Sequence, residues 1–197
     1  MKKIIALLTA LILSTAALSS CGQSTYYAEI SVENYGKIIV KLDAENAPRT
    51  VRNFVKLVNR GFYDGLTFHR VIYNFMIQGG CPFGNGTGDA GKDIVGEFAA
   101  NGYVNNISHK RGVISMARGN DPNSASCQFF ICNADATKLD GNYAAFGYVI
   151  EGMDVVDAIT ITTMFYANSD SGAIANKELQ AKIEYIRILE DYVEPQS

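Results

Sequence analysis

Hydrophobic and polar residues alternate along the first part of the chain, with the period of two that is typical of β-strands. Strands are predicted over residues 28–32 and 37–42, with inward-facing side chains at Ile30, Val32, Ile38, Val40 and Leu42. Between them, Asn34-Tyr35-Gly36 is a turn signal. The two strands are therefore predicted to form a hairpin.

The period changes to that of a helix over residues 47–60. Apolar residues recur there at i, i+3, i+4 and i+7, at Val51, Phe54, Val55 and Val58. Pro48 suits the first helical turn, and Gly61 suits the left-handed position that follows a helix. We expect this helix to close one end of a sheet or barrel.

The rest of the chain consists of short apolar runs separated by glycine-rich loops. Strands are predicted over residues 66–72, 75–79, 112–117, 128–132, 144–150 and 182–189. A second helix is predicted over residues 152–159, and the polar stretch 162–172 predicts a variable loop. Many short strands with two helices, and no strand–helix alternation, indicate an antiparallel barrel or sandwich.

One charged residue interrupts an apolar face. The period of two places Phe68, Arg70 and Ile72 on one face of their strand. Arginine is rarely buried unless it is paired. From these residues alone, two interpretations stay open. Either Arg70 forms an ion pair with Glu97 or an aspartate, or its guanidinium is held at the floor of an apolar pocket.

The segment Phe68-His69-Arg70-Val71-Ile72-Tyr73-Asn74-Phe75-Met76-Ile77-Gln78-Gly79-Gly80 resembles the core motif of the cyclophilins, which are peptidyl-prolyl cis/trans isomerases. Four further stretches match that family in order, at residues 85–88, 112–118, 120–131 and 139–147. The resemblance spans roughly residues 27–189. It implies a mainly β fold, an eight-stranded antiparallel closed barrel capped by two α-helices, in an isomerase domain of residues 27–197.

The resemblance also implies a set of site residues. The catalytic ones would be Arg70, Phe75 and Gln78, with Arg70 donating to the imide nitrogen and Gln78 gripping a substrate carbonyl or Arg70. Substrate-binding positions would be Met76, Ala117, Arg118, Gln128, Phe130, Leu139 and Tyr143. The backbone around Arg118 would pair with an extended peptide. Taken singly, each apolar member is more often part of a plain core.

Rotation about an X-Pro bond requires no nucleophile and no base, so no cofactor is expected. No His/Cys/Asp cluster has the spacing of metal ligands. Both histidines are expected to be structural, with His69 on the face opposite Arg70 and His109 in a loop. A rate that is flat from about pH 6 to 8 is therefore predicted. The competing interpretations are a peptide-binding module without turnover and a surface adhesin.

The family members most sensitive to cyclosporin carry Trp at the position of Lys138, and this chain contains no Trp. Weak cyclosporin binding is predicted.

The N-terminus predicts an export signal. Lys2 and Lys3 precede an apolar run over residues 4–18, which is shorter than the ~20 residues of a spanning helix. Leu18-Ser19-Ser20-Cys21 resembles a bacterial lipobox. That resemblance implies a signal peptide of residues 1–20, lipid attachment at Cys21 and a tether of residues 21–26. The alternative is an ordinary cleaved signal with a chance cysteine.

The net charge of the chain limits the classes of partner that it is expected to bind. Loss of residues 1–20 removes two lysines and leaves 15 basic against 20 acidic residues, a net charge of −5. Nucleic-acid binding leaves a basic footprint and is not supported. The expected protein is a single-domain monomer, lipid-anchored at the extracytoplasmic face of a bacterial membrane. Its expected partners are proline-containing polypeptides, and its expected task is to help exported proteins fold.

Three cysteines follow Cys21. Cys127 and Cys132 fall on one predicted strand, five residues apart, so they point to opposite faces some 16 Å apart and cannot bridge. Buried free thiols are expected, although a bridge from Cys81 to either of them stays open.

Overall fold

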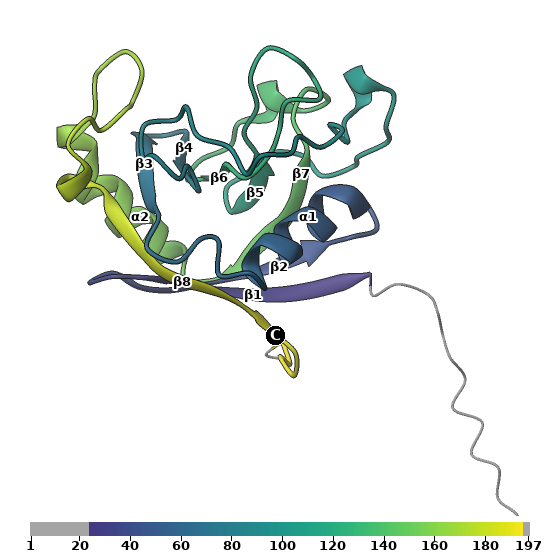
Figure 1. Cartoon of the computed structure of the whole chain (residues 1–197), viewed down its shortest axis with the longest axis horizontal. Helices are drawn as coiled ribbons and strands as arrows, with labels where there is room; N and C mark the ends of the chain where they lie inside the picture. The colour runs from purple at the N-terminus through teal and green to yellow at the C-terminus, as the bar shows by residue number, and fades with distance from the viewer. Residues whose placement is uncertain (1–23, 195–197) are drawn as a thin grey trace, which may run out of the picture.

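The structure is a computed structural model that describes residues 24–194 (Figure 1). The predicted leader and lipid-attachment residue Cys21 lie outside these residues. The first strand begins at Thr25, inside the segment predicted as a tether. The eight strands are β1 (Thr25–Val32), β2 (Gly36–Asp43), β3 (Thr67–Ile72), β4 (Met76–Gly79), β5 (Val113–Met116), β6 (Phe129–Cys132), β7 (Ala145–Glu151) and β8 (Ala181–Leu189).

The strands close into a barrel in the order β1-β2-β7-β5-β6-β4-β3-β8, and every pairing is antiparallel. The helices α1 (Pro48–Val58) and α2 (Met153–Thr163) lie at opposite sides of the barrel in Figure 1. Short 3-10 turns cover Ala99–Asn101, Thr137–Leu139, Met164–Tyr166 and Lys177–Leu179. The predicted fold class is confirmed, and α2 extends four residues beyond its predicted end.

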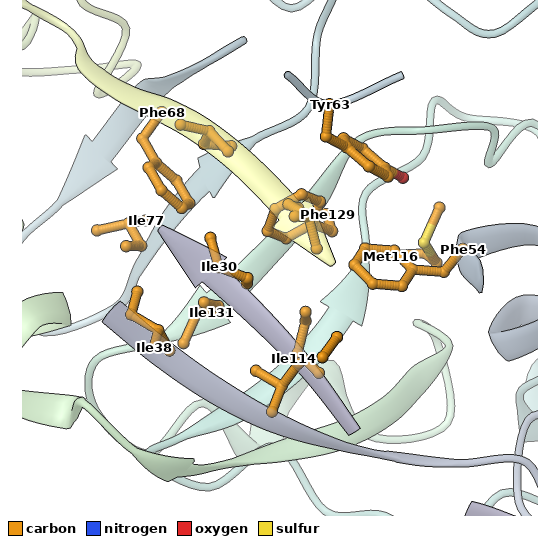
Figure 2. Close-up of a cluster of buried hydrophobic side chains, with 14 of the residues drawn as sticks. Ile30, Ile38, Phe54, Tyr63, Phe68, Ile77, Ile114, Met116, Phe129 and Ile131 are labelled. Carbon is orange, nitrogen blue, oxygen red and sulfur yellow. The ribbon is translucent and has the colours of Figure 1, made fainter. Parts of the chain in front are cut away.

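The barrel interior is filled by side chains from all parts of the chain (Figure 2). Phe54 of α1 packs edge-on against Phe129 of β6, with ring centroids 5.6 Å apart. Helix α2 contributes Val156 and Ile159, both fully buried, to the same cluster. The interior of the barrel is therefore the main hydrophobic core of the domain.

A buried carboxylate fixes the start of α1. Ala47, at the N-cap, provides no side-chain cap. Instead, Glu97 accepts hydrogen bonds from the backbone nitrogens of Arg49 at 3.0 Å and Thr50 at 2.8 Å, and from the Thr50 hydroxyl at 2.8 Å. An anion at a helix N-terminus is favoured by the unsatisfied N–H groups and the helix dipole. Glu97 therefore caps the N-terminus of α1 and is not the partner of Arg70.

A β-bulge at His69 interrupts the regular alternation of side chains along β3. Phe68 pairs with Gly79 and Arg70 with Gln78, so His69 is an extra residue on β3. Phe68 points into the barrel, where its ring centroid is 6.0 Å from that of Phe129 (Figure 2). The prediction that Phe68 shares a face with Arg70 and Ile72 is wrong, because the bulge reverses the alternation between the first two.

The three cysteines within the described residues are buried and free, as expected. Within residues 24–194, no helix has the length and apolar character needed to cross a bilayer.

Candidate active site

A small pocket of about 160 Å³ opens on the outer face of the barrel. Nine of the residues predicted for the site line it: Arg70, Phe75, Met76, Gln78, Ala117, Arg118, Phe130, Leu139 and Tyr143. Its apolar side chains form a buried cluster distinct from the barrel interior, built around Met76 and Phe130. Adjacent strands create this cluster, since Met76 and Gln78 of β4 pair with Cys132 and Phe130 of β6.

Arg70 lies in this pocket without a carboxylate partner among residues 24–194. Its Nε donates to the Ser171 carbonyl at 2.7 Å, and its Nη1 donates to Gln78 Oε1 at 3.0 Å and lies 3.8 Å from Met76 Sδ. The two N–H groups of Nη2 have no acceptor within the described part of the chain. Burial lowers the pKa of Arg70 from its ordinary value, but a guanidinium stays protonated. The site therefore presents a fixed cation with free donors.

A chain of hydrogen bonds through two glutamine side chains fixes the position of the Arg70 guanidinium. Because Gln78 accepts from Arg70 through Oε1, its Nε2 is the atom that donates to Gln128 Oε1, at 3.0 Å. Gln128 Nε2 in turn donates to the carbonyls of Gly86 and Gly88, both at 2.9 Å. Each amide thus has a single orientation that satisfies its neighbours.

Gln128 lies outside the small pocket and lines a larger cavity beside it. This large cavity has a volume of about 380 Å³ and shares Gln78, Ala117 and Arg118 with the small pocket. Arg118 is tied down at the boundary, because Nε and Nη2 donate to the Asn142 carbonyl at 3.0 and 2.9 Å. Its guanidinium also lies 4.7 Å from the Tyr143 ring centroid. The two hollows form one groove.

Sequence reasoning missed Ser171 as a contact of the site. The stretch 162–172 was predicted only as a variable loop, but Ser171 anchors Arg70 through its carbonyl. The neighbouring backbone runs beside β3, with Val71 N donating to the Gly172 carbonyl at 2.8 Å and Ile174 N to the His69 carbonyl at 2.9 Å. A backbone carbonyl leaves no mark in the sequence, so only the glycine at 172 offered a signal.

The buried side chain of His109 supports the pocket wall, because it contacts Asp140, the residue after Leu139, and packs against Phe130. Asp140 Oδ1 accepts from the backbone N of His109 at 2.7 Å and lies 2.8 Å from its Nδ1. The His109 ring stacks on Phe130, with centroids 6.0 Å apart. Burial lowers the pKa of His109, against the raising effect of Asp140. His109 is thus a structural support, as expected.

His69 is a buried residue of β3. It is the extra residue of the bulge, and a β-carbon at Gly86 would lie 3.6 Å from its Nε2, which puts the ring beside the loop that binds Gln128. Neither ring nitrogen has a hydrogen-bond partner among residues 24–194. Burial lowers the pKa of His69 to about 4, so the ring is neutral at pH 7. Its role as a proton donor or acceptor at that pH is not favoured.

These features suit a reaction that needs a pocket and donors rather than a reactive side chain. In the described residues, no group of three or more His, Cys, Asp or Glu side chains is arranged to hold a metal ion. The groove offers an apolar hollow, a cation with free N–H groups and exposed backbone around Arg118. Such a site is able to bind an extended peptide and to stabilise charge on an atom above the pocket.

Comparisons with known proteins agree with a site that binds peptides and acts on them. The chain matches the family described as cyclophilin type peptidyl-prolyl cis-trans isomerase/CLD over residues 27–182. It is 47% identical over 137 residues to a peptidyl-prolyl cis-trans isomerase of Helicobacter pylori, covering 68% of this chain and 80% of the relative. It is 46% identical over 123 residues to peptidyl-prolyl cis-trans isomerase B of Bacillus subtilis, covering 62% and 82%.

A crystal structure of a cyclophilin type isomerase from Cryptosporidium parvum superposes with a TM-score of 0.72 at 27% identity, covering 85% of this chain and 99% of the other. The chain therefore belongs to the cyclophilin-type peptidyl-prolyl cis-trans isomerase family. The family and these relatives support isomerase activity for it.

Proposed function

We propose that this chain accelerates rotation about X-Pro bonds of exported proteins while a lipid on Cys21 holds it at the extracytoplasmic face of a bacterial membrane. The observation that carries the catalytic part is the Arg70 guanidinium, which lies beside an apolar pocket and has two N–H groups without a partner among residues 24–194. A related Cryptosporidium parvum structure was obtained in the presence of the dipeptide Ala-Pro, which supports proline peptides as the ligand class.

The proposed roles follow from the chemistry of the imide bond. Amide resonance sets a rotation barrier of about 18–20 kcal/mol. In the twisted state the nitrogen becomes pyramidal and regains its lone pair, so a donor directed at it binds that state better than the planar one. Arg70 supplies the donor, while Phe75, Met76, Phe130 and Leu139 bind the proline ring. Each 1.4 kcal/mol of preference raises the rate about tenfold.

The decisive experiment replaces Arg70. Arg70→Ala is expected to lower kcat/KM for a proline peptide by about a hundredfold or more, since a charge-assisted hydrogen bond to the transition state is lost. Arg70→Lys keeps the charge but loses the fork and should recover only part of the rate. Circular dichroism checks that both variants are folded. An Arg70→Ala enzyme as fast as wild type would refute the assigned role.

A binding module without turnover is the alternative. It predicts that wild-type protein binds proline peptides, seen as chemical-shift changes, without accelerating their exchange between cis and trans. The match to an isomerase family and to relatives named as isomerases favours the enzyme.

The location is proposed from residues 18–21. Several acyl chains on one cysteine would give stable anchoring, whereas a single chain binds membranes only marginally. Cys21→Ser is expected to abolish incorporation of labelled palmitate and to move the protein out of the membrane fraction. Ser20→Ala is the matched control, because a small residue before the cysteine is kept. Membrane association that survives Cys21→Ser would contradict the anchor.

A further inference from the structure

Lys138 is a cation beside the small pocket that has no part in the proposed binding of the imide. Lys138 lies in the turn Thr137–Leu139, directly before the pocket-lining Leu139. Its Nζ is 5.0 Å from the centroid of the Phe75 ring, which forms part of the pocket wall. The residue is exposed and has no ion-pair partner within residues 24–194. Its charge is therefore free to meet a ligand.

The acidic residues that flank Lys138 along the chain are engaged elsewhere. Asp140 Oδ1 contacts His109, and its Oδ2 accepts from the Ser108 hydroxyl at 2.6 Å. Asp135 Oδ2 forms an ion pair with Lys110 at 2.8 Å. Neither carboxylate turns toward Lys138 as a partner, and the small pocket is lined by no acidic side chain.

The other end of the groove has the opposite charge. The exposed carboxylates of Asp89 and Asp93 line the large cavity, whereas Lys138 lies at the far side of the small pocket. Between them, Arg118 is fixed by backbone carbonyls. A peptide that lies along the groove thus passes from a negative end to a positive end.

The direction of the backbone at residues 117–119 determines which way a bound peptide runs along the groove. Ala117 and Arg118 line both hollows, whereas Gly119 lines only the large cavity, so this segment runs from the small pocket toward the large cavity. A peptide that pairs with it as an antiparallel strand runs the opposite way. Residues before the proline then lie at the large cavity, and residues after it lie near Lys138.

We propose that Lys138 makes this site prefer peptides with an acidic side chain one or two residues after the proline, while Asp89 and Asp93 favour a basic side chain before it. This preference rests on the isomerase function proposed above and adds the class of substrate. Exposed ion pairs contribute modestly, about 1.4- to fivefold each. The combined effect of both ends is therefore expected to be roughly two- to twenty-fivefold.

Two blocked peptides of identical composition test the preference. Lys-Ala-Ala-Pro-Ala-Glu and Glu-Ala-Ala-Pro-Ala-Lys share the Ala-Pro bond and zero net charge, so overall attraction to the protein cancels. Exchange rates measured by NMR with the full-length protein at low ionic strength should give the first peptide the higher kcat/KM. The difference should shrink toward equality at about 1 M salt, where the screening length is about 3 Å.

Lys138→Glu should bring the two rates close together, because both ends of the groove would then attract a lysine side chain and repel a glutamate. The ratio of the two rates cancels any general loss of activity. Lys56→Glu on α1 changes the net charge equally away from both hollows and should leave the order unchanged. Equal rates in the wild type at low salt, or an unchanged ratio of the two rates in Lys138→Glu, would overturn the preference. If neither peptide nor a neutral Gln analogue is accelerated, the proposed function itself fails.

Discussion

Gln78 connects the cation of the pocket to the peptide groove. Its carbonyl oxygen accepts from Arg70, and its amide nitrogen donates to Gln128. If Arg70 acts on the twisted imide, then Gln78 is a positioning residue as well as a candidate substrate contact. A hydrogen bond of this kind contributes about 0.5–1.5 kcal/mol, so Gln78→Leu is expected to lower kcat/KM about two- to tenfold.

Gln78→Glu separates the two contacts of that side chain. A carboxylate still accepts from Arg70 but does not donate to Gln128. Its kcat/KM should lie between those of wild type and Gln78→Leu if holding Arg70 is what matters. An isomerisation assay of the three proteins decides this, and a Gln78→Glu enzyme as slow as Gln78→Leu would show that the link to Gln128 is the important one.

At the scale of elements, the loop before β8 completes the arginine site. Gly172 has φ of +74°, and a β-carbon there would overlap the Ile72 side chain and lie 2.9 Å from the Val71 carbonyl. Gly172→Ala must therefore displace the loop and with it the Ser171 carbonyl that binds Arg70. We expect a stability loss of more than the roughly 1–2 kcal/mol of left-handed strain, together with a several-fold lower kcat/KM.

Gly65→Ala is the control for this loop. Gly65 has φ of +77°, but a β-carbon there meets nothing within 4 Å. Urea denaturation should show only the backbone cost, and the isomerisation rate should stay at the wild-type value. If Gly172→Ala loses stability but keeps full activity, the contact between Ser171 and Arg70 is not needed for catalysis.

The N-terminus of α1 depends on a carboxylate from a distant loop. Glu97→Gln removes the charge and one acceptor from three hydrogen bonds to Arg49 and Thr50. We expect the free energy of unfolding to fall by about 1–3 kcal/mol. Glu45→Gln changes an exposed carboxylate near the same helix and should cost much less. Equal losses in urea denaturation would mean that only the long-range field of the helix matters.

What the sequence predicts well is local. The 3.6-residue period around Val51 and Phe54 locates α1, and the alternation around Ile38 and Val40 locates β2. The bulge at His69 depends on how β3 pairs with β4, and pairing register is a property of two strands rather than one. The site residues were placed together through their resemblance to a family, since spacing alone left the partner of Arg70 open.

At the scale of the whole molecule, the interior and the site are built from opposite faces of the same strands. Ile77 and Ile131 point into the barrel, and Gln78 and Phe130 point out of it. Because successive residues serve the two faces, the fold positions the pocket through backbone geometry while its side chains stay outside the main core. Substitutions on the outer face are thus expected to change catalysis with smaller effects on stability than interior ones.

The two buried histidines make stability, but not catalysis, depend on pH. Burial lowers the pKa of His69 to about 4, against about 6.5 in an unfolded chain, and lowers that of His109 in the same direction. Between these values the unfolded state binds more protons, so the free energy of unfolding falls as pH drops from about 6.5 to 4. For His69 alone the loss is on the order of 3 kcal/mol. Asp140, whose pKa is lowered by hydrogen bonds from His109 and Ser108 although burial raises it, contributes only at still lower pH.

Denaturation curves across this range, beside NMR titration of both imidazoles, measure the effect directly. The isomerisation rate of the folded protein should stay flat from about pH 6 to 8, because Arg70 remains charged and His69 remains neutral throughout. His69→Gln removes one of the two titrating imidazoles and should make the stability curve less steep, even if it lowers the maximum. An imidazole of His69 that titrates near 6.5 in the folded protein would contradict the burial argument, and a bell-shaped rate profile would reveal an acid or base within the groove.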